Sequence, residues 1–274
     1  MKLGYIDYLN CYPFYYQMFE REKLAGVEVV PAYPSELNRM MAEGSLDMSP
    51  ISAAMYPELA EQVLLLPDFC LSSVGYVHSV LLSSSMPIED LDKKRVGLTS
   101  ASKTSVILLK ILLSRYYRIE PQYVPTPPNP SLKKGSLEAA LLIGNEAMMG
   151  EMAPYTYDLG DLWMRKTGWP VVFAVFAVNK ALIDNDYAGV AAVVDSYRKS
   201  LAFLAGQRET VIRKAAERYP LVHYDIDAYY RALQYAFAPS LREAFSFYLQ
   251  SAAELGLLQK TTEVEFAETR RAED

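Results

Sequence analysis

The chain has 274 residues and 51% of them are hydrophobic, so it can bury a sizeable core as one large domain or as two lobes. Its 27 basic and 33 acidic residues give a net charge of −6 without long charged runs, and we expect no nucleic-acid partner. No apolar run of 18 residues and no secretory signal is evident, and the two cysteines do not indicate a disulfide framework. These features predict a cytoplasmic protein with no membrane partner, and they leave its oligomeric state open.

The first predicted unit is a strand, a polar connection and a helix. Residues 3–6 are apolar and predict a buried strand, and Pro13 suits the first turn of a helix. Asn10 therefore lies in the connection at the carboxyl end of a strand, where open α/β sheets bind their ligands. The alternative is that Asn10 only forms a turn.

Strand and helix patterns continue to alternate, which predicts α/β architecture. We expect helices over 14–24, from Ser35 to near Gly44, and over 53–60, and strands over 27–32, 46–51, 63–66 and 75–83. On an extended run, neighbours such as His78 and Ser79 point to opposite faces. If Ser79 faces a cleft, His78 should not.

A second strand–helix unit follows the turn-rich stretch 87–94. A strand over 96–98 leads into a loop rich in Ser and Thr, 99–105, and then into an apolar helix from Val106. Free N–H groups and hydroxyls at the positive end of a helix form a cradle for a carboxylate or phosphate. An ordinary N-cap is the competing interpretation, because Ser and Thr are favoured there anyway.

The remaining elements predict two lobes. We expect strands near Tyr123 and over 139–143 and 171–178, and no regular element over the Pro-rich 125–130. From Tyr187 onward we expect helices, with Leu233 and Phe237 at helical spacing. The last residues, 263–274, predict a frayed end. Crossings near residues 86 and 178 divide the chain into a discontinuous first lobe, 1–86 and 178–274, and a second lobe, 87–177. This connectivity is similar to the type II periplasmic-binding-protein-like fold, in which two α/β lobes close on a ligand cleft by a hinge motion.

Six stretches, at 8–13, 46–52, 72–80, 102–106, 141–147 and 158–170, carry a more specific resemblance. In their order along the chain they resemble the chorismate dehydratases of the futalosine route to menaquinone. The resemblance implies removal of water from chorismate to give 3-[(1-carboxyvinyl)oxy]benzoate. Aromatisation drives this reaction, so we expect no redox cofactor, and we expect no metal because no Cys/His cluster of the sequence has metal-ligand spacing. The resemblance covers residue 3 to about residue 180.

The family's functional residues match positions of this chain. The resemblance implies catalytic roles for Asn10 and Ser79, and substrate binding by Ser52, Ser102, Lys103, Thr104, Ser105, Gly144 and Asn145. Three positions depart from the family pattern: Lys103 replaces an Arg, Asn145 replaces an Asp, and Met55 stands where a carboxylate is usual. Lysine keeps the charge but lacks the bidentate fork of arginine, so these departures affect the expected substrate geometry.

The matched motifs contain no carboxylate or histidine placed to act as a base. An amide such as that of Asn10 does not take up protons at neutral pH, but it orients a reacting group by hydrogen bonds. We therefore hypothesise that the enolpyruvyl carboxylate of the substrate itself takes the proton.

Two other functions are compatible with this architecture. One is a non-catalytic binding protein or sensor for a small cyclic carboxylate. The other is the sister enzyme that makes 1,4-dihydroxy-6-naphthoate. It opens with a Pro-Asn-Asp stretch and depends on a His, and neither feature stands here at a matching position.

Overall fold

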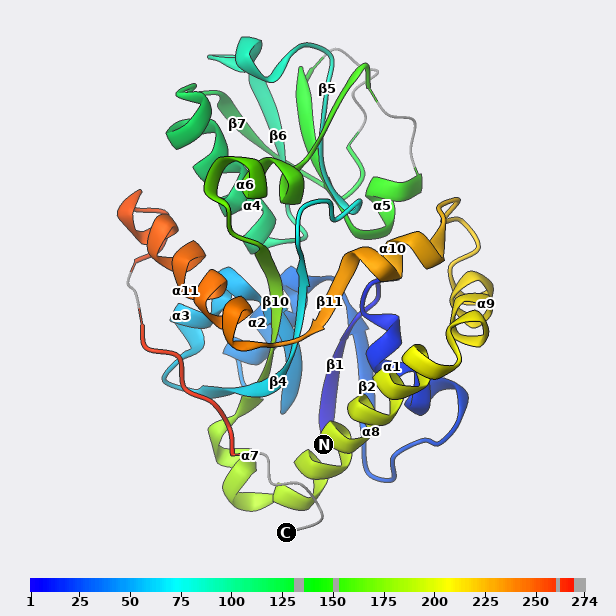
Figure 1. Cartoon of the computed structure of the whole chain (residues 1–274). Helices are drawn as coiled ribbons and strands as arrows, with labels where there is room; N and C mark the ends of the chain where they lie inside the picture. Colours follow the sequence, from blue (N-terminus) through cyan, green and yellow to red (C-terminus); the bar gives the residue numbers. More distant parts are fainter. Residues whose placement is uncertain (131–135, 150–152, 260–261, 269–274) are drawn as a thin grey trace.

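The computed structural model describes residues 1–130, 136–149, 153–259 and 262–268, and these form two β-sheets surrounded by helices (Figure 1). The strands are β1 (Lys2–Ile6), β2 (Glu28–Ala32), β3 (Met48–Ser52), β4 (Val63–Ser73), β5 (Val80–Ser84), β6 (Arg95–Thr99), β7 (Gln122–Thr126), β8 (Ala139–Ile143), β9 (Tyr155–Asp158), β10 (Val171–Asn179) and β11 (Leu233–Ala236). The α-helices are α1 (Tyr12–Glu20), α2 (Pro34–Ala42), α3 (Tyr56–Leu59), α4 (Lys103–Ile111), α5 (Gly144–Met149), α6 (Leu159–Thr167), α7 (Lys180–Asn185), α8 (Tyr187–Gly206), α9 (Arg208–Arg218), α10 (Ile226–Ala232) and α11 (Pro239–Glu254). Two 3-10 helices, η1 (Ala53–Met55) and η2 (Ile88–Leu91), and a π-helix, η3 (Leu112–Tyr117), complete the list.

The first lobe is built on a six-stranded sheet in the order β11-β4-β10-β3-β1-β2. Strand β1 is parallel to β2 and β3, whereas β10 runs antiparallel between β3 and β4. Strand β3 is buried at every residue, as expected for a sheet covered on both faces. The apolar runs that predicted β1, β2, β3 and β10 are confirmed.

The second lobe is built on a five-stranded sheet in the order β7-β6-β8-β5-β9. Strand β6 lies parallel to β7 and β8, and β5 lies antiparallel to β8 and β9. Pro125 and Thr126 belong to β7, so the prediction of no regular element from residue 125 was wrong at these two positions. An edge strand tolerates proline because it has a side with no partner strand that needs its N–H.

The chain crosses between the sheets twice, at residues 74–79 and 168–170 (Figure 1). Strand β5 thus lies in the second sheet and β10 in the first, so both crossings come earlier than the expected boundaries near residues 86 and 178. Neither strand's sequence shows which sheet it joins, because both are short apolar runs. We propose that the lobes follow the sheets, with residues 80–167 as the second lobe.

Two further sequence predictions were wrong in detail. Leu233 begins strand β11, which pairs with β4, although its spacing from Phe237 predicts a helix. The N-cap of α2 is Tyr33 and not Ser35, because Pro34 already occupies the first turn of that helix. Among the described residues, no helix is long and apolar enough to cross a membrane.

Strand ends from both sheets meet between the lobes. Strand β1 ends at Ile6, before the connection that leads to Asn10, β3 ends at Ser52, and β8 ends just before Gly144. The start of β10 lies beside the end of β3, with Ala174 opposite Ser52, and Val80 at the start of β5 lies opposite Ile143 at the end of β8. The topology therefore gathers loops from both lobes in one place.

Candidate functional site

A narrow cavity between the lobes contains most of the residues implied by the sequence. Its lining includes Asn10, Ser52, Ser79, Ser102, Ser105 and Gly144. The cavity has a volume of about 50 Å³, enough for a few water molecules, whereas cavities that hold drug-sized ligands measure roughly 300–1,000 Å³. The structure therefore has its lobes closed, and a six-membered ring with two carboxylates would require the cavity to widen.

Ser79 and Tyr229 are hydrogen-bonded to each other at this cavity, and Asn10 lies beside them. The hydroxyl of Tyr229 donates to Oγ of Ser79 at 2.7 Å, and the side chain of Asn10 lies close enough to Tyr229 to lower the pKa of its phenol. Oδ1 of Asn10 is buried and has no hydrogen-bond partner. An unpaired buried acceptor carries a cost of about 1–3 kcal/mol, so it marks a place where a ligand's donor would be favourable.

Ser52 is held in place by a buried asparagine of α2. Nδ2 of Asn38 donates to Oγ of Ser52 at 3.1 Å, and Oδ1 of Asn38 accepts the backbone N–H of Ser52 at 2.9 Å. Asn38 is a site residue that was not predicted from the sequence. A polar residue next to Leu37 and one turn before Met41, on the buried face of a helix, was the available signal.

The N-terminus of α4 provides the second-lobe wall of the cavity. Ser102 is the N-cap, and its Oγ accepts the N–H of Ser105 at 3.3 Å and lies 3.1 Å from the Ser105 hydroxyl. The N-cap interpretation is confirmed, and the same serine also lines the cavity, while the binding of a carboxylate there stays a prediction. The remaining first-turn N–H groups and the helix dipole favour an anion at this end.

The other three implied residues lie outside the cavity lining and join the lobes. The Thr104 hydroxyl accepts the N–H of Ala54 at 3.1 Å, and Nζ of Lys103 forms an ion pair with Glu58. Oδ1 of Asn145 accepts the N–H of Leu9 at 2.9 Å. In this closed arrangement all three side chains therefore act between the lobes.

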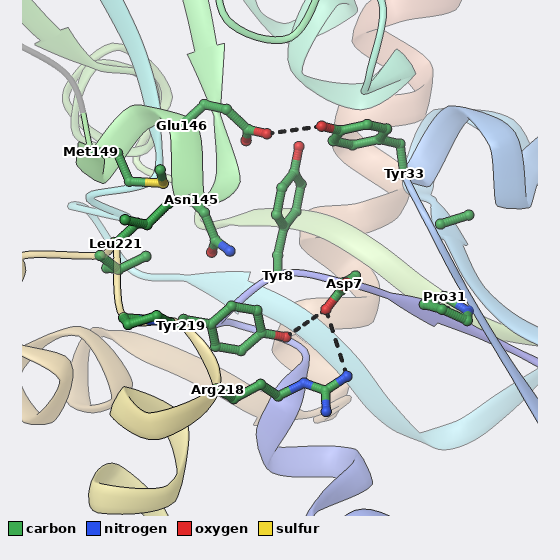
Figure 2. Close-up of a pocket in the computed structure, with 13 residues that line it drawn as sticks. Asp7, Tyr8, Pro31, Tyr33, Asn145, Glu146, Met149, Arg218, Tyr219 and Leu221 are labelled. Carbon is green, nitrogen blue, oxygen red and sulfur yellow. Dashed lines mark hydrogen bonds and ion pairs between the residues drawn. The ribbon is translucent and has the colours of Figure 1, made fainter.

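A larger pocket of about 730 Å³ lies next to the narrow cavity (Figure 2). Its lining includes Asp7, Arg218 and Glu146, and Tyr8 lines both spaces. The hydroxyl of Tyr8 points toward Glu146 and Tyr33, which hydrogen-bond to each other at 3.2 Å. Burial, and then the neighbouring Glu146, raises the pKa of Tyr8, so it remains a neutral phenol between the two spaces.

Gly144 allows Tyr8 to occupy this position. Its φ is +60°, and a Cβ there would lie 2.4 Å from Cε2 of Tyr8. Any side chain at residue 144 would collide with the ring and strain the backbone. Gly144 thus shapes the boundary between the narrow cavity and the outer pocket.

Asp158 organises the first crossing between the lobes. This buried carboxylate caps α6 and accepts N–H groups from Gly160, Asp161, Val77 and His78 at distances from 2.6 to 3.2 Å. Burial raises the pKa of Asp158, and the backbone donors oppose that rise. The contact fixes the segment that ends at Ser79.

His78 is not part of an extended strand, contrary to the sequence prediction. Its φ is +62°, so the alternation of faces between His78 and Ser79 does not apply. The imidazole lies between the rings of Tyr76 and Tyr224, at centroid distances of 5.7 and 5.5 Å, and is not among the cavity-lining residues. The expectation that His78 stays out of the cleft is met for a different reason.

Tyr229 is the main functional candidate that the sequence analysis missed. It lies on α10, beyond the stretches that carried the family resemblance, and it is one of 21 tyrosines. No local pattern distinguishes it from tyrosines that only pack. Its contact with Ser79 spans 150 positions, so only the folded chain reveals it.

A family model and a relative of known name both relate this chain to menaquinone biosynthesis. Residues 1–254 match the model of a family described as menaquinone biosynthesis. The chorismate dehydratase of Thermus thermophilus is 32% identical over 202 residues, which cover 65% of this chain and 69% of that protein.

Solved structures give the fold. A protein of Archaeoglobus fulgidus superposes with a TM-score of 0.76 at 19% identity, covering 94% of this chain and 98% of the other. The periplasmic aliphatic sulphonate binding protein SsuA of Escherichia coli superposes with a TM-score of 0.64 at 12% identity, covering 100% of this chain and 95% of the other. The predicted two-lobed α/β fold of the periplasmic-binding-protein type is confirmed.

Proposed function

This chain belongs to the menaquinone-biosynthesis family, and on that premise we propose that it is a chorismate dehydratase, a hydro-lyase that converts chorismate into 3-[(1-carboxyvinyl)oxy]benzoate and water. One observation, the composition of the cavity lining, supports this activity independently of family membership. The narrow cavity joins uncharged hydrogen-bonding groups from both lobes with the positive end of α4 and contains no Asp, Glu, His, Lys or Arg in its described lining. Such a site suits an anionic substrate that supplies its own base.

The reaction requires positioning more than strong acid or base groups. A proton leaves the ring carbon that carries the enol ether, the electrons of that C–H bond complete the aromatic ring, and hydroxide leaves the neighbouring carbon. Proton and hydroxide together make the released water, so no oxidant or reductant is consumed. Aromatisation provides the driving force, and the protein's part is orientation.

We assign the substrate's ring carboxylate to the N-terminus of α4. There Ser102 and Ser105 offer hydroxyl donors, and the helix dipole favours negative charge. Asn10 and Ser79 orient the leaving hydroxyl on the first-lobe side, and Ser52 completes the polar wall. The enolpyruvyl carboxylate takes the ring proton, because the cavity lining provides no conventional base.

The experiment that tests this function is incubation of the purified protein with chorismate and no added cofactor, followed by mass spectrometry. We expect an aromatic product lighter than chorismate by one water. Unchanged chorismate together with ligand-induced thermal stabilisation would instead identify a non-catalytic binding protein or sensor. Neither conversion nor stabilisation would mean that chorismate is not the ligand. The cytoplasmic location and the lack of a cofactor remain predictions.

Asn10→Ala provides the first test of a residue. We expect kcat to fall by about 100-fold or more, because the variant loses a group that orients the reacting atoms, with little change in thermal stability. Asn185→Ala is the control, since Asn185 only donates to Ala181 O at 2.8 Å within α7. Wild-type turnover in Asn10→Ala would remove Asn10 from the mechanism.

A further inference from the structure

Tyr229 lies beside Asn10 and Ser79, the two residues that we propose orient the leaving hydroxyl of the substrate. Its side chain is fully buried, and its hydroxyl donates to Oγ of Ser79 at 2.7 Å. The phenol has one proton, so once that proton goes to Ser79 the phenol oxygen is left as an acceptor, and the neighbouring Asn10 side chain lowers the pKa of Tyr229 as a donor to that oxygen does. An amide donates only through Nδ2, so a donor interaction of Asn10 with Tyr229 leaves its Oδ1 for another partner. That oxygen is buried and without a partner, and Asn10 lines the cavity.

The hydrogen bond from Tyr229 also determines which way the Ser79 hydroxyl can donate its proton. Because its Oγ already accepts from Tyr229, its own proton is available to donate. In the structure that proton goes to Val77 O at 3.4 Å, a long and weak hydrogen bond that a better acceptor would replace. Burial raises the pKa of Tyr229, which keeps the phenol protonated and therefore a donor.

We propose that Tyr229 is a positioning residue that acts through Ser79 and Asn10, directing the Ser79 proton and the Asn10 oxygen into the cavity. The chain of hydrogen bonds runs from Asn10 Nδ2 to the Tyr229 hydroxyl and on to Ser79. Ser79 then donates to the departing hydroxyl of the substrate, and Asn10 accepts from a donor on the same substrate. This assignment rests on the proposed dehydratase function.

The test uses Tyr229→Phe and a matched control, Tyr197→Phe. The Tyr197 hydroxyl also donates to another hydroxyl, that of Tyr15, at 2.7 Å, and the side chain is equally buried, but it lies on α8 in the first-lobe core. We expect Tyr229→Phe to lower kcat by about tenfold or more while KM changes less than about threefold. Tyr197→Phe should lose comparable thermal stability and keep its kcat.

A double-mutant cycle with Ser79→Ala separates positioning from packing. If Tyr229 acts in part through Ser79, the loss of activity in the double variant is smaller than the two single losses added together. A kcat for Tyr229→Phe equal to that of wild type, or a loss that adds in full to that of Ser79→Ala, would overturn the proposal.

A measurement that needs no turnover separates this proposal from the proposed function. The side-chain NH₂ resonances of Asn10 are assigned by their disappearance in Asn10→Asp. They should shift in Tyr229→Phe and stay in place in Tyr197→Phe. A wild-type protein that does not convert chorismate overturns the dehydratase function even if this shift is seen. Unshifted resonances in Tyr229→Phe overturn the role of Tyr229 even if the wild type is active.

Discussion

Asp158 shows how one side chain can determine the shape of a site that it does not enter. Its carboxylate accepts the N–H groups of Val77 and His78 and so fixes the backbone directly before Ser79. His78 has a positive φ, which an unsupported chain would rarely adopt. Gly160 contributes by its small size, because a Cβ there would lie 2.4 Å from the carbonyl oxygen of Gly75.

Asp158→Asn should change how stability depends on pH. Because the folded-state pKa of Asp158 lies above its ordinary value of 3.8, folding takes up a proton between the two values. The stability that this group contributes is therefore present below its unfolded pKa and is lost as the pH rises through the folded pKa. Asparagine does not titrate, so the difference in unfolding free energy between wild type and variant should shrink through this window and stay constant above it.

Urea unfolding of both proteins at pH values from about 4 to about 7 measures that difference. A difference that grows with pH would show that the backbone donors outweigh burial. The same variant should also be less active, because Asn replaces two acceptor oxygens by one and releases part of the segment before Ser79.

At the scale of elements, α4 has one residue, Ser102, that caps the helix and also lines the cavity. Its nine residues bury an apolar face against the second lobe, while Ser102 and Ser105 remain at the cavity. The Tyr248 hydroxyl of α11 donates to Thr104 O at 3.0 Å, so the first turn of α4 is also supported from the first lobe. The N-terminal end of this helix, where we propose that a carboxylate binds, thus has contacts with both lobes.

Ser102→Ala should separate these two roles. We expect about 1 kcal/mol of lost stability from the missing cap, and about a tenfold rise in KM from the lost hydrogen bond to a substrate carboxylate. Asn179→Ala is the matched control, because Asn179 caps α7 by accepting the Ala181 N–H at 3.0 Å, outside the cavity lining. The control should show the stability loss alone. An unchanged KM in Ser102→Ala would place the substrate carboxylate elsewhere.

At the scale of the whole molecule, hydrogen bonds between the lobes hold the cavity closed. The N–H of Ser35 donates to Ala101 O at 3.0 Å, and the contacts of Leu9 with Asn145 and of Ala54 with Thr104 add to it. The two crossings at residues 74–79 and 168–170 are the places for a hinge, and Gly75 and Gly168 there have φ values of +80° and +75°. Since the closed cavity is too small for chorismate, binding requires these contacts to open and reform.

Asn145→Ala should shift the molecule toward the open state. The variant loses the acceptor for the Leu9 N–H, so we expect a larger radius of gyration in small-angle X-ray scattering without ligand. We also expect a higher KM, because substrate must supply more of the free energy of closure. Asn185→Ala again serves as control. A compact variant with a raised KM would instead favour direct contact of Asn145 with the substrate, as the family resemblance implies.

The sequence by itself determined the class of fold and the places where the site is built. Apolar runs that alternate with polar connections identify β1, β3, β6, β8 and β10, and residues at strand ends and helix starts, such as Asn10 and Ser102, face a common cleft because α/β topology puts them there. Local patterns can do this because backbone periodicity and capping act over a few residues.

Only the tertiary structure decided which sheet β5 and β10 join, and which of the implied residues face the cavity. Lys103, Thr104 and Asn145 stand beside cavity residues in the chain, yet their partners are Glu58, Ala54 and Leu9 of the other lobe. Tyr229 reaches Ser79 across 150 positions. Such pairings depend on how the two lobes close on each other, and no short-range pattern encodes that geometry.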